Sequence, residues 1–225
     1  MKVLIFDSGT IINLSMNGLL YILEELKKKF DGKFIITEAV KQEIFDRPYN
    51  IPRFELEALE IKKLIDLKVL EPPETLGIKE SLLKNKINQL MNAANNAVEA
   101  EGKRITIVSE AEISCLSLSS ELENRKIENL IAIDERTTRI LSEKPENLEK
   151  IMTKKLNKKV KIDFGALKIF SNFKFIRSSE IGYVAYKTGV LRVSGAKALE
   201  AVLYATKYKG AAISFEEIEQ LKKMG

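Results

Sequence analysis

The chain has 225 residues, of which 45% are hydrophobic, and its 37 Lys and Arg outnumber 32 Asp and Glu, giving a formal net charge of +5. This length suits one large domain or two small ones, and the hydrophobic share allows a sizeable core. The sequence has no His and a single Cys, which excludes an internal disulfide, Ser-His-Asp and Cys-His catalysis, and zinc sites built on these residues. For an enzyme, a hard metal held by carboxylates is therefore the expected route.

The N-terminal segment lacks the pattern of a secretory signal, and no stretch approaches the roughly 20 apolar residues that span a bilayer. We therefore expect a cytoplasmic protein with no membrane segment. The modest excess of positive charge suits a nucleic-acid partner. A Lys- and Glu-rich surface, as in heat-adapted proteins, explains the same charge balance equally well.

Apolar patterns along the chain predict short strands that alternate with helices. Strands are expected at residues 2–6, 34–36, 69–70, 130–133 and 175–176, and helices at 14–30, 37–45, 54–64, 78–101, 109–122, 135–141, 179–187, 196–207 and 215–223. Residues 8–10 should form a turn, and the Lys-rich stretch 146–172 has no clear pattern. The alternation favours an α/β fold, a three-layer α/β/α sandwich around a central, mainly parallel sheet.

Two acids directly follow predicted strands. Asp7 follows the apolar run 3–6, and Asp134 follows the run 130–133. In an open parallel sheet ligands bind at the carboxyl ends of the strands, and two carboxylates there repel each other unless a cation lies between them. Each Asp taken alone could simply cap the helix that follows it. The pair together favours a metal site.

Two further acids lie early in the predicted helices that follow strands. Glu43 precedes the apolar Ile44, and Glu112 lies at the border of the apolar helix face that contains Ala111 and Cys115. Either residue alone would be interpreted as a solvated helix position. Their place in a series of strand–acid and strand–helix–acid units makes them candidates for the same site.

Together these segments resemble the motifs of the PIN domain, a family of metal-dependent nucleases. The resemblance lies in residues 3–12 (VLIFDSGTII), 36–44 (ITEAVKQEI), 109–118 (SEAEISCLSL) and 131–139 (IAIDERTTR). It implies a single PIN-like domain over residues 1–225, with insertions at 72–104 and 143–172. The tail from residue 181 is also similar to the C-terminal end of some archaeal and bacterial members.

The resemblance assigns site residues as well. It implies that the following acids bind Mg²⁺ or Mn²⁺ and act in catalysis: Asp7, Glu43, Glu112 and Asp134. Supporting roles would fall to Ser8, Glu110, Glu135 and Ser178. The implied activity is endoribonucleolytic hydrolysis of RNA phosphodiester bonds by a metal-activated water, leaving a 3′-hydroxyl and a 5′-phosphate. Removal of Asp7 or Asp134 should then abolish cleavage and spare the fold.

Nucleic-acid contacts are expected from basic residues close to Asp134. Arg136 and Arg139 are one helical turn apart and would contact phosphates, and the lysines of 154–159 form a local run that is equally typical of solvated surface. Tyr183 and Tyr186 would stack on bases or, more simply, pack in the core or a homodimer.

Two other functions remain open from the sequence. The first is a non-catalytic PIN module that binds RNA or a partner protein, and the second is the toxin of a toxin–antitoxin pair. Such toxins resemble compact PIN domains, and this chain is longer. A role beside partners in RNA processing is also open, and the sequence identifies neither the RNA that is cut nor the number of metal ions.

Overall fold

In the computed structural model, which describes residues 1–224, a central parallel sheet organises an α/β fold. Its strands are β1 (Lys2–Phe6), β2 (Gly32–Ile35), β3 (Leu70–Glu71), β6 (Glu128–Ala132) and β8 (Phe175–Ile176). They lie in the order β3-β2-β1-β6-β8, and every neighbouring pair is parallel. The central position of β1 places its carboxyl end, where Asp7 follows, in the middle of the sheet edge at which ligands bind in such folds.

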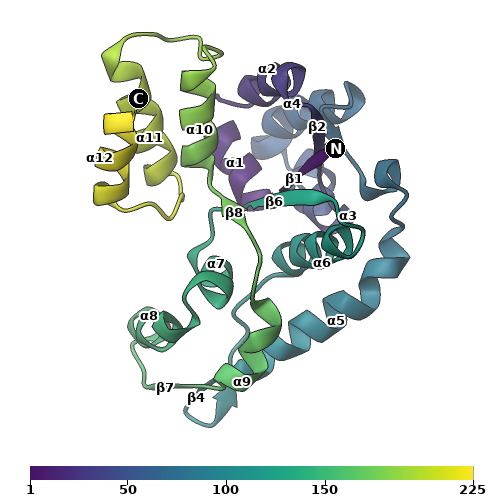
Figure 1. The fold of residues 1–225 in the computed structure, drawn as a ribbon, viewed down its shortest axis with the longest axis vertical. Helices are drawn as coiled ribbons and strands as arrows, with labels where there is room; N and C mark the ends of the chain where they lie inside the picture. The colour runs from purple at the N-terminus through teal and green to yellow at the C-terminus, as the bar shows by residue number, and fades with distance from the viewer. Residues whose placement is uncertain (225) are drawn as a thin grey trace.

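Helices cover both faces of this sheet, which confirms the predicted three-layer sandwich (Figure 1). Helix α6 (Glu110–Asn124) lies on one face, and α1 (Ser8–Met16), α2 (Tyr21–Lys29) and α10 (Ser178–Lys187) lie on the other. The apolar stripe of α6 is fully buried, as its spacing predicted. Because α6 begins at the same edge of the sheet as α1, the first turns of the two helices lie close to the strand ends.

The remaining helical segments complete the layers and the connections. They are α3 (Glu38–Lys41), η1 (Gln42–Asp46), η2 (Pro48–Asn50), η3 (Pro52–Phe54), α4 (Glu55–Asp66), η4 (Pro73–Leu76), α5 (Glu80–Ala97), α7 (Arg136–Glu143), η5 (Pro145–Asn147), α8 (Leu148–Leu156), α9 (Phe164–Leu167), η6 (Lys168–Phe170), α11 (Ala196–Tyr208) and α12 (Phe215–Met224). Among the described residues, none of these helices combines the length and the apolar character that crossing a bilayer requires.

The first helical region differs from the prediction. The expected helix over 14–30 is two helices, and residues 8–10, expected as a turn, are the first turn of α1. Asp7 acts as the N-cap of α1, and the chain then breaks at Gly18, whose φ of 63° lies in the left-handed region that glycine adopts readily. The prediction was wrong because it read Gly9 as a turn residue, whereas Gly9 donates its N–H to the capping Asp7.

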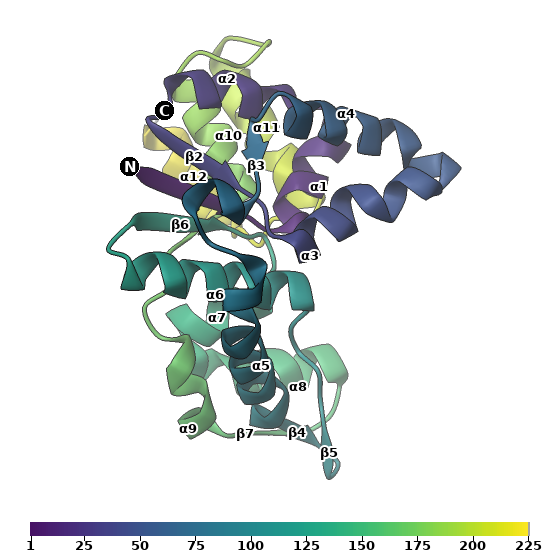
Figure 2. The same ribbon diagram turned by 90° about the vertical axis from the view of Figure 1, so that its right-hand side faces the viewer.

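The two segments predicted as insertions, residues 72–104 and 143–172, pack against each other and form what we call the α5–α9 lobe (Figure 2). Strand β4 (Val98–Ala100) pairs antiparallel with β7 (Val160–Ile162) and with β5 (Lys103–Arg104). The lobe shares one continuous hydrophobic core with the sheet. The single domain predicted over 1–225 remains a prediction, and its last residue lies outside the described residues.

The C-terminal helices α11 and α12 stand beside α10 and have a small core of their own. Gly182 of α10 allows α11 to approach closely, because a Cβ built at this position would lie 2.4 Å from Cγ1 of Val202. Tyr183 and Tyr186 are partly buried against this small core, which agrees with packing rather than base stacking. In this position the pair of helices faces α7 and α8 across an open groove.

Candidate active site at the carboxyl ends of the strands

Asp7 lies at the centre of the candidate site. Its backbone N–H donates to the carbonyl of Ala132 at 2.9 Å, which fixes it between β1 and β6, and its Oδ2 accepts from the N–H of Gly9 at 3.1 Å. The other oxygen, Oδ1, is buried and has no hydrogen-bond partner among residues 1–224. Burial raises the pKa of Asp7 to about 8, and the nearby charge of Glu112 adds to the increase. Asp7 is therefore a buried acid with one oxygen left free to bind a ligand.

Glu43 is held next to Asp7 by a hydrogen bond from the adjacent residue, Ser8. It lies in η1, a short π-helical segment, and its Oε2 accepts a hydrogen bond of 2.7 Å from the hydroxyl of Ser8. Such π-helical turns occur often at functional sites. The buried Ile44 anchors this turn in the core, and Thr37 caps the preceding helix. The supporting role predicted for the Ser8 hydroxyl thus has a direct geometric basis.

Glu112 reaches the site from α6, which covers the face of the sheet opposite to α1. It lies in the first turn of α6, where its Oε2 accepts from the N–H of Ser109 at 2.8 Å and from the hydroxyl of Thr138 at 2.9 Å. Burial raises its pKa, the Ser109 hydrogen bond opposes this, and Glu135 and Glu43 raise it further. The capping box between Ser109 and Glu112 therefore also holds an acid at the strand ends. Sequence reasoning missed Thr138, which had no signal beyond its position in the helix after Asp134.

Asp7, Glu43 and Glu112 are close enough to act on one another electrostatically, since both glutamates raise the pKa of Asp7. Within residues 1–224, however, no three acids are arranged so that they could hold a metal ion as they stand. Two of them are engaged with hydroxyl groups, from Ser8 and Thr138. The chemical nature of the donors suits a hard cation, because all are carboxylate oxygens. One of them, Oδ1 of Asp7, is buried and has no hydrogen-bond partner among residues 1–224. A full coordination shell would require the carboxylates to lie closer together than they do here.

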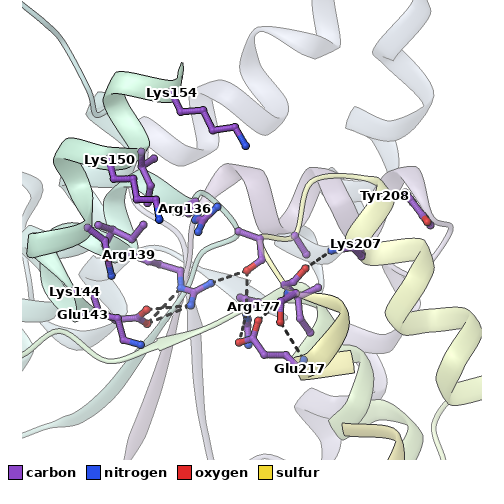
Figure 3. Close-up of a pocket in the computed structure, with 17 residues that line it drawn as sticks. Arg136, Arg139, Glu143, Lys144, Lys150, Lys154, Arg177, Lys207, Tyr208 and Glu217 are labelled. Atoms are coloured by element: carbon purple, nitrogen blue, oxygen red, sulfur yellow. Dashed lines mark hydrogen bonds and ion pairs between the residues drawn. The ribbon is translucent and has the colours of Figure 1, made fainter. Parts of the chain in front are cut away.

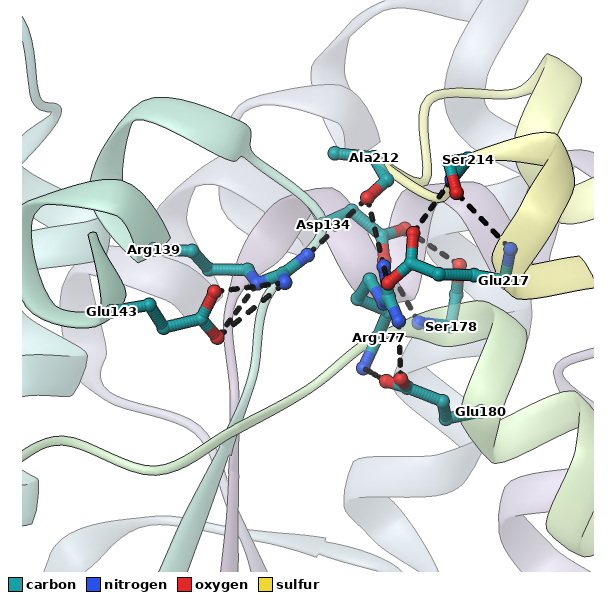
Figure 4. Close-up of polar contacts among 9 residues, drawn as sticks. All are labelled: Asp134, Arg139, Glu143, Arg177, Ser178, Glu180, Ala212, Ser214 and Glu217. Carbon is teal, nitrogen blue, oxygen red and sulfur yellow. Dashed lines mark hydrogen bonds and ion pairs between the residues drawn. The ribbon is translucent and has the colours of Figure 1, made fainter. Parts of the chain in front are cut away.

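Asp134 has a different environment from the other three predicted acids. Its Oδ1 accepts from the N–H of Ser178 at 2.8 Å, and its Oδ2 accepts from the Ser178 hydroxyl at 2.7 Å (Figure 4). Oδ2 also accepts from the Asn13 amide at 2.8 Å. Burial raises the pKa of Asp134, and the bonds from Ser178 oppose that change. Asn13 also donates to the carbonyl of Thr206. Asp134 therefore joins α1, α10 and α11 to the end of β6 rather than presenting a free carboxylate.

The other predicted supporting residues divide into two groups. Ser178 donates to a predicted acid, as Ser8 does, and Glu135 caps α7 by accepting from the N–H of Thr138 at 2.8 Å. Glu110 instead is exposed at the first position of α6. Sequence reasoning also missed Asn13, because the helix that carries it was expected to begin later. A correct start at Ser8 would have placed Asn13 on the same helix as the Asp7 cap.

Arg136 and Arg139 line a groove of about 880 Å³ between α7–α8 and the C-terminal helices (Figure 3). We call this the basic groove, since seven of its 17 lining residues are Lys or Arg. Arg136 is exposed, whereas Arg139 forms an ion pair of 3.1 Å with Glu143. The two arginines predicted to bind phosphates thus line one groove, and both belong to α7, the helix that Glu135 caps.

No protein-family model, no curated protein and no solved structure matches this chain. The fold class therefore stands on the chain's own geometry, as an α/β sandwich with clustered acids at the carboxyl ends of its central strands. The resemblance to the PIN domain remains a prediction from the motifs.

Proposed function

We propose that this chain is a Mg²⁺- or Mn²⁺-dependent endoribonuclease of the PIN type. The observation that carries the proposal is the buried, unpaired Oδ1 of Asp7 beside Glu43 and Glu112 at the end of the central strand. Gathering three acids at one buried place destabilises a fold unless a cation or a proton offsets their repulsion. Strongly perturbed carboxyl groups of this kind concentrate at functional sites.

Different residues of the chain would have different roles in the reaction. Asp7, Glu43 and Glu112 would supply oxygen ligands, while Ser8 and Thr138 hold the glutamate side chains near their working positions. A bound divalent cation would activate water and offset charge on the scissile phosphate. The proton that Asp7 carries at neutral pH would leave when a cation binds, so that its carboxylate becomes available. Asp134 would act as a positioning residue, because both of its oxygens hold neighbouring elements in place.

RNA is the proposed substrate on two grounds. The motif resemblance implies a ribonuclease. The basic groove also lies beside the acids, because α7 lines the groove and is capped by Glu135, whose charge acts on Glu112. Electrostatic attraction to the phosphate backbone would bring the substrate to the acids. Hydrolysis would leave a 3′-hydroxyl and a 5′-phosphate.

The decisive test is cleavage of end-labelled RNAs with Mn²⁺ or Mg²⁺ and with EDTA as the control. Glu112→Gln should reduce the rate at least about 100-fold, the usual cost of losing a group that stabilises charge in the transition state. The matched control is Glu123→Gln, which changes an exposed acid on the same helix and should leave the rate unchanged. Wild-type rates in Asp7→Asn or Glu112→Gln would refute the assignment of the acids.

A non-catalytic module that binds RNA is the second candidate. It is favoured by the basic groove, whose exposed cations would bind RNA without any metal. Under this alternative the chain binds RNA, yields no metal-dependent products, and gains no thermal stability from Mn²⁺. The cleavage assay and a melting curve with and without Mn²⁺ distinguish the two functions.

A further inference from the structure

The basic groove contains cations of two kinds. Arg177 is 6% exposed, forms ion pairs with Glu180 at 2.5 Å and Glu217 at 2.9 Å, and donates to the carbonyl of Ala212 at 3.0 Å (Figure 4). Arg139 likewise donates to the Ala212 carbonyl, at 3.4 Å, and is paired with a glutamate. These guanidinium groups are already neutralised, so they hold α7, α10 and the segment before α12 together at the base of the groove.

A second set of cations is exposed and forms no ion pair with a described residue. It comprises Arg136 of α7, Lys144 at the end of α7, and Lys150 and Lys154 of α8. Lys150 and Lys154 are four residues apart, so they lie on one side of α8, and both extend into the groove in Figure 3. Positive charge without an internal partner is therefore concentrated on the α7–α8 wall, where a phosphate backbone would find unpaired donors.

The opposite wall carries an exposed aromatic ring. Tyr208, the last residue of α11, is 73% exposed and lines the same groove. Its ring is stacked on that of Tyr204, with centroids 6.2 Å apart and an interplanar angle of 21°. The contact with Tyr204 restricts the orientation of the Tyr208 ring. A positively charged wall with an exposed aromatic ring at the opposite rim is a combination used to bind single-stranded nucleic acids, in which unpaired bases stack on side chains.

We propose that the basic groove binds single-stranded RNA, with its phosphates on Arg136, Lys150 and Lys154 and one base stacked on Tyr208. The choice of RNA rests on the proposed function, whereas the binding of a single strand rests on the groove itself. The paired Arg139 and Arg177 build the groove and do not contact the strand.

The inference is tested by fluorescence anisotropy with a labelled, unstructured RNA and the Asp7→Asn chain, in EDTA, over a range of NaCl concentrations. Lys150→Ala/Lys154→Ala should weaken binding about tenfold and reduce the slope of log K against log salt by roughly 1.4, since each phosphate contact to a single strand contributes about 0.7. The matched control is Lys79→Ala/Lys84→Ala, which removes two exposed lysines at the start of α5 and should change neither quantity.

The stacking part of the inference has its own variants. Tyr208→Ala should weaken binding by roughly a factor of ten, as expected for the loss of one stacked base, and Tyr208→Phe should retain it. A duplex of the same sequence should compete poorly, because its bases are not available to the ring. Equal binding of duplex and single strand, or unchanged affinity and salt slope in the lysine variant, would overturn the groove assignment.

The outcomes also separate this inference from the proposed nuclease activity. RNA that binds in the groove but is not cut by the wild-type chain with Mn²⁺ leaves the groove assignment standing and rejects the nuclease. Cleavage that persists at the wild-type rate in Lys150→Ala/Lys154→Ala, with wild-type affinity, rejects the groove and leaves the acids as the active site.

Discussion

Replacing Asp7 with Asn should stabilise the metal-free protein at neutral pH even though it removes a predicted catalytic group. Burial, with a further contribution from Glu112, raises the pKa of Asp7 from 3.8 to about 8. The folded protein thus holds this proton more tightly than the unfolded chain does. The stability that this provides is fully present below the unfolded pKa and is lost as the pH rises through the folded value.

The size of the effect follows from the same two values. A solution at pH 7 is about three pH units above the pKa of the unfolded carboxyl, whereas the folded carboxyl is still mostly protonated. At roughly 1.4 kcal/mol per unit, this lowers the free energy of unfolding of the wild type by about 4 kcal/mol. Asn cannot ionise, and it is as good an N-cap as Asp, so α1 keeps its first turn. For a chain of this length, each kcal/mol shifts the melting temperature by about 2–4 °C.

The assay is a series of thermal melts in EDTA at about pH 5, 7 and 9, where the advantage of the variant should grow with pH. Asp7→Asn should melt roughly 8–16 °C above the wild type at pH 7, and further above it at pH 9. Asp31→Asn, a change at an exposed Asp, is the control and should show no such trend. Mn²⁺ should stabilise the wild type and not the Asp7 variant. A variant that melts below the wild type at every pH would show that Asp7 is not held in a repulsive, buried environment.

Two further predictions concern the elements around the site. Asp134→Ala should destabilise the protein by about 3–5 kcal/mol in urea denaturation, because three buried donors of Asn13 and Ser178 lose their acceptor. A change below about 1 kcal/mol would show that the side chain does not join these helices. Gly182→Ala should cost about 1–3 kcal/mol, since its Cβ would meet Val202, and adding Val202→Ala should recover part of the loss. Additive losses in the double variant would contradict that contact.

The Asp134 prediction revises an expectation drawn from the sequence. The motif resemblance implied that removal of Asp134 would spare the fold, as for Asp7. In the structure the two residues differ, because one oxygen of Asp7 has no partner among residues 1–224, whereas both oxygens of Asp134 accept hydrogen bonds. Loss of activity in an Asp134 variant must therefore be compared with its stability before a direct role is assigned.

The sequence by itself determined the order of the strands along the chain and the positions of the main acids. Short apolar runs predicted all the strands of the central sheet, and Asp7 was placed at the end of β1 as observed. The helices expected from residues 109 and 215 begin at or next to those positions, and Ser109 and Ser214 cap them by bonds to residues three positions on. Features of this kind are local, and the spacing of apolar and capping residues is sufficient to specify them.

Only the tertiary structure decided how distant segments meet. The pairing of β4 with β7 joins two stretches that the sequence left as separate insertions, and Asn13 reaches Asp134 across 121 positions. The basic groove likewise exists only because α7–α8 and α11–α12 face each other. Such contacts depend on the packing of whole helices and strands. In the sequence, a lysine that forms an ion pair looks the same as one that does not, because the difference lies in the neighbours that the fold brings to it. For this reason the acids could be named from the chain alone, whereas the division of their roles could not.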